Sequence, residues 1–117
     1  MRALTVASVL LLAPIASFAA SPTQCVSWPR NIAEVKLKNA GIVELANLDR
    51  SKTHAVRIAS EKVGKDLYRD VYDITFYEKS GRAIEVITSS EASSYECSMG
   101  AVDVFVVKEK LADDSDK

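Results

Sequence analysis

The chain has 117 residues and a formal net charge of −1 at pH 7, with 26% of its residues charged. This length leaves room for a single domain. Acidic and basic residues are interspersed without a basic stretch that would attract phosphates, so we expect no nucleic-acid partner.

The N-terminus has the pattern of an export signal. Arg2 provides a positive start, and residues 3–16 carry no charge. This apolar stretch is shorter than the roughly 20 residues that a membrane span needs. Ser17 and Ala19 are small enough for the −3 and −1 positions of signal-peptidase cleavage. We therefore expect removal of residues 1–19, export by the general secretory pathway to the periplasm, with secretion as the alternative, and no membrane span afterwards.

Two cysteines remain in the exported chain, Cys25 and Cys97. Oxidising compartments pair such thiols, and the wide spacing excludes a Cys-x-x-Cys redox motif. A disulfide across this loop can stabilise the fold by up to about 4 kcal/mol by restricting the unfolded chain. We predict a Cys25–Cys97 disulfide, and we expect Trp28 to pack over it.

A helix is predicted over residues 31–40. Asn31 can act as its N-cap, and Glu34 can reach back as in a capping box. Apolar residues recur at helical spacing, and Gly41 can take the left-handed conformation that ends a helix. Pro29 is expected to stop any regular element before this helix.

The next two segments are less distinctive. Residues 42–48 alternate loosely and are predicted as a short strand, followed by a turn at 49–52. Residues 53–63 fit two patterns: apolar residues at helical spacing, and a strand pattern around Val56 and Ile58. The helical pattern is slightly favoured, and the strand is the alternative.

Strand patterns dominate the rest of the chain. Residues 71–77 are rich in β-branched and aromatic residues. A turn at 78–81, where Gly81 supplies a positive φ, joins them to a strand at 83–88. A last strand is expected at 101–107. In each strand, alternate residues are predicted to share one face: Tyr72, Ile74 and Phe76 in the first, Ile84 and Val86 in the second, and Val102, Val104 and Val106 in the last.

These elements predict an α+β fold with a small antiparallel sheet of three to five strands, one or two helices and one disulfide. The expected organisation is a signal peptide at 1–19, an arm carrying Cys25 at 20–30 and a single domain at 31–111. Residues 112–117 are acidic and are expected to be a disordered tail.

The polar segment around Cys97 is the main candidate for a binding site. It combines hydroxyl side chains, carboxylates and a tyrosine, the residue types of adaptable recognition loops, and a neighbouring disulfide lowers the ordering cost of binding. The other interpretation is a polar connection whose hydroxyls cap its own backbone. The residues predicted to form a partner-binding loop are Ser90, Glu91, Ser93, Ser94, Tyr95 and Glu96.

Catalytic and metal-binding patterns are weak. His54 is the single histidine, and its nearest serines, Ser51 and Ser60, lie in no nucleophile motif. Clustered ligands at metal-site spacing are lacking as well, since Asp113, Asp114 and Asp116 lie together in the expected tail. We expect a protein without a cofactor, a metal or catalytic activity.

One segment resembles a known family. Val71-Tyr-Asp-Ile-Thr-Phe, the turn Ser80-Gly-Arg and Ile84-Glu-Val-Ile-Thr are similar to the PepSY-type domain of exported bacterial proteins, over about residues 53–90. The Asp-x-x-Thr-Gly that usually follows the family's second strand is replaced by Ser89-Ser-Glu-Ala. The resemblance implies a small, non-enzymatic module that binds or inhibits a protease-like partner, and it assigns no site residue.

These features together predict a small periplasmic binding protein whose partner is another protein. An inhibitor of a hydrolase, or an immunity protein against one, would have this size, rigidity and lack of catalytic groups. The alternative is an envelope accessory or stress protein that binds a small ligand between sheet and helix.

Overall fold

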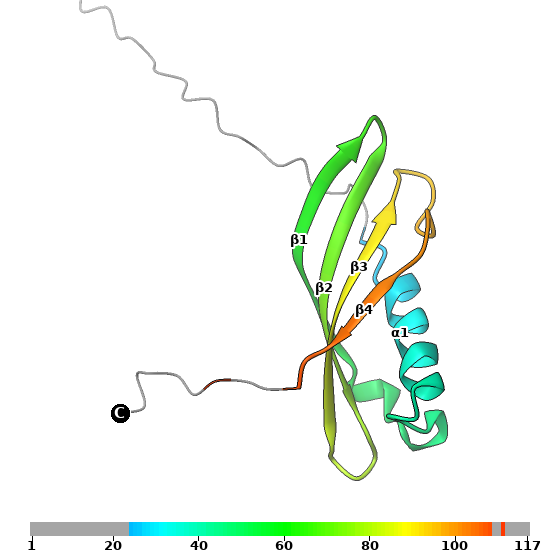
Figure 1. The fold of residues 1–117 in the computed structure, drawn as a ribbon, viewed down its shortest axis with the longest axis vertical. Coiled ribbons are helices and arrows are strands. Elements are labelled where there is room, and N and C mark those ends of the chain that lie inside the picture. The colour runs from blue at the N-terminus through cyan, green and yellow to red at the C-terminus, as the bar shows by residue number, and fades with distance from the viewer. Residues whose placement is uncertain (1–23, 109–110, 112–117) are drawn as a thin grey trace, which may run out of the picture.

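The computed structural model describes residues 24–108 and residue 111, and it shows one helix packed on a four-stranded antiparallel sheet (Figure 1). The expected α+β class is confirmed. The expected signal peptide at 1–19 and acidic tail at 112–117 lie outside the described residues. The elements are α1 (Ser27–Asn39), the 3-10 turns η1 (Leu45–Asn47) and η2 (Arg50–Lys52), and the strands β1 (His54–Gly64), β2 (Leu67–Tyr77), β3 (Ala83–Ala92) and β4 (Asp103–Val106).

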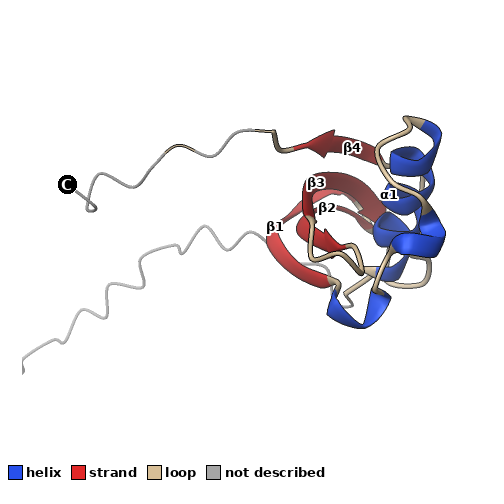
Figure 2. Ribbon diagram, turned by 90° about the horizontal axis from the view of Figure 1, so that it is seen from below, coloured by secondary structure: helices blue, strands red, loops and turns tan. Residues whose placement is uncertain are grey.

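The strands follow one another in space as they do in sequence, in the order β1-β2-β3-β4. Each strand is antiparallel to the next, so short turns suffice as connections between β1, β2 and β3. Helix α1 covers one face of the sheet, which we call the inner face, and the opposite face is the outer face (Figure 2).

The core lies between α1 and the inner face. Alternate residues of β2 and β3 are buried, as the period-2 pattern predicts. Val102 is buried as well, and Val104 and Val106 pack partly buried against the core. The apolar residues at its centre come from the helix, the connection and both middle strands: Ala33, Leu37, Val43, Leu48, Tyr72, Ile74, Phe76, Ile84 and Val86.

The start of α1 differs from the prediction. The helix begins at Ser27 instead of Asn31, its N-cap is Val26, and no side chain caps it. The predicted capping box is therefore wrong. Pro29 lies inside the first turn, where backbone N–H groups have no partner within a helix, so its missing donor costs nothing there. Proline thus allows a helix start that we had placed after it.

The end of α1 is as predicted. Gly41 has φ +72° and follows the C-cap residue Ala40. Its N–H donates to the carbonyl of Lys38 at 2.9 Å, and the N–H of Ile42 donates to the carbonyl of Leu37 at 3.0 Å. This pair of bonds is a Schellman motif, which satisfies the last carbonyls of the helix.

The connection between α1 and β1 is not the strand that we predicted at 42–48. It contains η1, and Leu48 makes a single antiparallel bridge to Glu78. The N–H of Asp49 also donates to the carbonyl of Tyr77 at 2.8 Å. The loosely alternating residues 42–48 therefore form a loop that is hydrogen-bonded to the β2–β3 turn, not a strand. The predicted turn at 49–52 contains η2.

Residues 53–63 form most of β1, so the favoured helical interpretation is wrong and the strand alternative holds. The apolar residues that suggested a helix, among them Val56 and Val63, are exposed instead of lining one buried face. Pairing with β2 selects the strand over the helix. The β-branched residues of β2 favour a strand there, and β1 forms backbone hydrogen bonds with it along most of its length.

Candidate functional site

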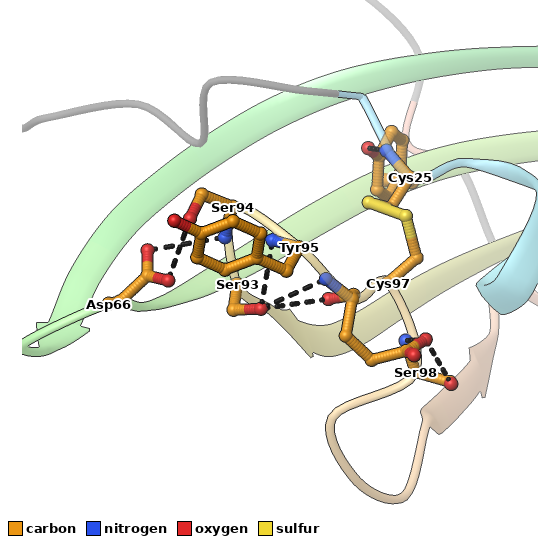
Figure 3. The surroundings of a disulfide bond; sticks show 9 residues. Cys25, Asp66, Ser93, Ser94, Tyr95, Cys97 and Ser98 are labelled. Atoms are coloured by element: carbon orange, nitrogen blue, oxygen red, sulfur yellow. Dashed lines mark hydrogen bonds between the residues drawn. A yellow bond between two sulfur atoms is a disulfide. The ribbon is translucent and has the colours of Figure 1, made fainter.

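The predicted disulfide is present between Cys25 and Cys97, whose Cα atoms are 5.3 Å apart. It joins the chain just before α1 to the segment between β3 and β4 (Figure 3). Cys25 is 4% exposed, and its N–H donates to the hydroxyl oxygen of Tyr72 at 3.1 Å. The bridge therefore attaches this segment to the buried end of the sheet.

Two of the predicted loop residues belong to a strand instead. β3 extends to Ala92 and so includes Ser90 and Glu91. Ser90 is 5% exposed and pairs with Asp70, while Glu91 accepts a hydrogen bond from Arg69 Nη2 at 3.3 Å. The strand continues because its inner side accepts a small serine. The loop placement of Ser90 and Glu91 is therefore wrong, whereas their role in partner binding stays a prediction.

The loop proper spans residues 93–98, and we call it the recognition loop. Ser93 builds it: its hydroxyl oxygen accepts hydrogen bonds from the N–H of Tyr95 at 3.2 Å and of Glu96 at 3.0 Å. Its own N–H donates to the carbonyl of Glu96 at 2.8 Å. Ser93 is 7% exposed, so it supports the loop from beneath and is not available to a partner.

Ser94 fastens the loop to the β1–β2 turn, as Figure 3 shows. Its N–H donates to Asp66 Oδ1 at 3.2 Å, and its hydroxyl donates to Asp66 Oδ2 at 2.7 Å. Both carboxylate oxygens are engaged by one residue across 28 positions of sequence. Sequence reasoning missed Asp66, because a turn aspartate usually bonds its own backbone.

Glu96 is exposed and is held by its neighbour. Its Oε1 accepts hydrogen bonds from the Ser98 hydroxyl at 2.7 Å and from the Ser98 N–H at 3.1 Å. These bonds, the hydroxyl bond first, lower the pKa of the Glu96 carboxyl below its ordinary value. The loop therefore presents a fixed negative charge at neutral pH.

Tyr95 lies between these anchored residues and is 94% exposed. Its N–H is used by Ser93, so its backbone position is defined. An aromatic side chain of this size usually buries a large area in a folded protein. The predicted loop therefore presents an exposed tyrosine, Tyr95, and an exposed glutamate, Glu96, on a turn whose backbone is held by hydrogen bonds.

Polar groups lie buried on the inner face near this end of the sheet. Asp70 is fully buried, and its Oδ1 accepts from the Ser60 hydroxyl at 2.5 Å. Among the described residues, four buried polar atoms find no hydrogen-bond partner: Asp70 Oδ2, Thr88 Oγ1, Trp28 Nε1 and, on the outer face, Asp73 Oδ1. Trp28 itself is half-buried, and its packing over the disulfide stays a prediction.

The structure does not support a catalytic pair of His54 with Ser51 or Ser60. Ser51 donates its hydroxyl to Asp49 Oδ1 at 2.6 Å, and Ser60 donates to Asp70, so both hydroxyls are bound to carboxylates. Within the part of the chain that the structure describes, no three His, Cys, Asp or Glu side chains come together where they could hold a metal ion.

The fold and the braced loop define a small, disulfide-bonded α+β domain. Comparisons with protein-family models, curated proteins and solved structures gave no match. The resemblance to the PepSY-type domain over residues 53–90 therefore stays a prediction. No helix within residues 24–108 is long and apolar enough to span a membrane.

Proposed function

We propose that this protein is a small exported binding protein that recognises a protein partner through the recognition loop, with Tyr95 as the central contact and Glu96 beside it. The observation that carries the proposal is a tyrosine that is 94% exposed on a loop whose backbone is fixed on three sides. Those three fixed points are the Cys25–Cys97 disulfide, the turn around Ser93 and the double hydrogen bond from Ser94 to Asp66.

Preorganisation makes such a loop effective. A flexible loop loses conformational entropy when it binds, and a loop already held in one conformation avoids much of this cost. Tyrosine adds contact area with few rotatable bonds, and it is enriched among the residues that dominate binding energies. Tyr95 is 94% exposed, so a partner with a cleft that receives its ring would be complementary to it.

The compartment and the class of partner complete the proposal. A disulfide fits an oxidising compartment, and the expected export signal favours the periplasm. We propose a hydrolase as the partner, with the protein acting as its inhibitor or immunity protein rather than as an enzyme. Core side chains pack between α1 and the sheet. The small-ligand alternative would use the open pocket beside the end of α1, which is lined by Ile42, Ile84 and Val106 among others.

Affinity capture tests the proposal. The exported chain, with its disulfide intact, is immobilised and exposed to periplasmic extract from its own and competing bacteria. We expect the native protein to retain a stoichiometric partner and Tyr95→Ala to lose it. Val35→Ala is the matched control, because Val35 is an exposed apolar residue on α1, and it should retain the partner.

Either of two results would contradict the proposal. Retention of the partner by Tyr95→Ala would exclude the recognition loop as the binding surface. Failure of the native protein to retain any protein would contradict a protein partner altogether.

A further inference from the structure

The outer face of the sheet carries an apolar row that crosses all four strands. The strand registers align Val56 with Asp73, Asp73 with Ile87, and Ile87 with Phe105. Phe105 is 60% exposed and Val56 is 45% exposed, whereas Ile87 is half-buried between them. Helix α1 lies on the opposite face, so no helix among the described residues covers this row (Figure 2).

Asp73 interrupts this row near its centre. Its Oδ1 is buried by the surrounding side chains, and none of the described residues provides that oxygen with a hydrogen bond. A buried carboxylate oxygen without a donor costs free energy that a hydrogen-bonding partner would recover. The row therefore combines exposed apolar surface with a carboxylate that its own surroundings satisfy incompletely, so a positive charge placed beside it would be favourable.

The outer face is also acidic. In the described strands, the residues that share this face include five carboxylates and a single Arg or Lys side chain, Arg69, which is paired with Glu91 at 3.3 Å. Opposite charges across an interface attract, and like charges repel. The five acidic residues are Glu61, Asp73, Glu85, Glu91 and Asp103.

We propose that the outer face binds a cationic amphipathic segment of a partner protein. Its apolar side chains would cover Val56, Ile87 and Phe105, and a Lys or Arg side chain would lie against the negative charge of the Asp73 carboxylate. Both features of the face have a counterpart in such a segment: its apolar area in the apolar side chains, and its negative charge, with Asp73 at the centre, in the basic ones.

Charge argues against two occupants that this chain could supply itself. Residues 112–117 contain three aspartates and one lysine, and their net negative charge opposes binding to an acidic face. A second copy that docked through the same face would bring like charges together around Asp73. The partner is therefore a different, basic molecule. This surface is distinct from the recognition loop, and the inference does not rest on the proposed function.

A pair of synthetic peptides tests the inference by fluorescence anisotropy with the native, disulfide-bonded protein. The first is a labelled amphipathic peptide of Leu and Lys, and the second has Glu in place of every Lys. We expect the Lys peptide to bind, more weakly as salt is added because the charges are screened. The Glu peptide should not bind.

Substitutions locate the binding surface. Val56→Ser, Phe105→Ser and Asp73→Asn should each weaken binding of the Lys peptide by about tenfold, the scale expected for a central contact. Val35→Ser is the matched control, because Val35 on α1 is 47% exposed against 45% for Val56. This control and Tyr95→Ala should bind the peptide as the native protein does.

The exposed positions of Val56 and Phe105 allow their substitution without opening the core, and a circular dichroism spectrum checks each variant. Equal binding of the Glu and Lys peptides would overturn the inference. Unchanged binding in Val56→Ser and Asp73→Asn would overturn it too, even if Phe105→Ser failed to fold.

Discussion

Thr88 is a fully buried residue that carries a polar hydroxyl group. It pairs with Tyr72 on the inner face, and its Oγ1 has no hydrogen-bond partner among the residues described. Valine has the same shape without the hydroxyl. We therefore expect Thr88→Val to raise the free energy of unfolding by about 1 kcal/mol, since an unsatisfied buried polar group is removed.

Urea unfolding measures this difference. Thr75→Val is the control, because Thr75 lies on the outer face of β2, half-buried, and its hydroxyl is not enclosed by the core. Its substitution should change stability much less. A loss of stability in Thr88→Val would show that the hydroxyl has a partner in solution.

Tyr72 is the residue that links stability to alkaline pH. Burial first, and then the nearby Asp70 carboxylate, raise the pKa of Tyr72 above its ordinary value near 10. Below that value the phenol is neutral in both the folded and unfolded chain. As the pH rises toward the folded-state pKa, the unfolded chain loses this proton first, so the stability contributed by the neutral phenol is lost.

Absorbance titration of the phenolate checks this prediction. We expect Tyr72 to ionise above its ordinary pKa, and Tyr72→Phe to remove that late step. Absence of a late step that Tyr72→Phe removes would contradict it. Unfolding in urea at rising pH should show the matching decline in the native protein and a shallower one in Tyr72→Phe.

At the scale of elements, the sequence predicts β2, the β2–β3 turn and the end of α1 well. Each has a local cause: alternating β-branched and aromatic residues, and the glycines Gly41 and Gly81, whose φ values are +72° and +97°. Local chemistry suffices there because no other conformation satisfies the same residues.

Elements that depend on distant partners were predicted less well. β1 has residues that fit a helix as well as a strand, and pairing with β2 selects the strand. β3 extends past residue 88 because Ser90 is opposite Asp70 on the inner face, a fact of register that is absent from the local pattern. The start of α1 was missed because proline was taken as a barrier.

In the candidate site, too, local features were predicted and tertiary contacts were not. The composition of the segment around Cys97 indicated a recognition loop, and Tyr95 and Glu96 are indeed exposed on it. Its bracing could not be predicted, since Ser94 bonds Asp66 across 28 positions. The local sequence predicted the exposed residues Tyr95 and Glu96, whereas tertiary contacts such as that of Ser94 with Asp66 fix the loop conformation.

For the molecule as a whole, the disulfide is the largest single constraint. It closes a span of 72 positions in a small domain. Reduction should lower the free energy of unfolding by up to about 4 kcal/mol, because the unfolded chain regains the entropy of that loop. The expected result is a clearly lower melting temperature in reductant.

The double variant Cys25→Ala/Cys97→Ala supplies the control for this experiment. Its melting temperature should match that of the reduced native protein and should not respond to reductant. An unchanged melting temperature on complete reduction of the native protein would contradict the stabilising role of the bridge.

The two proposed surfaces lie on different parts of the molecule and have different chemistry. The recognition loop presents one exposed aromatic ring, that of Tyr95, whereas the outer face is acidic and partly apolar. Binding at one surface leaves the groups of the other unused. Variants at Tyr95 and at Val56 therefore separate the two activities.

The most direct test of the central claim is the affinity of the captured partner, measured by calorimetry with the native protein, Tyr95→Ala and Asp66→Ala. We predict a loss of about 30-fold or more for Tyr95→Ala, the range of a dominant interface residue. Asp66→Ala should cause a smaller loss, because it loosens the loop without removing a contact. Equal affinity of Tyr95→Ala and the native protein would contradict recognition through this loop.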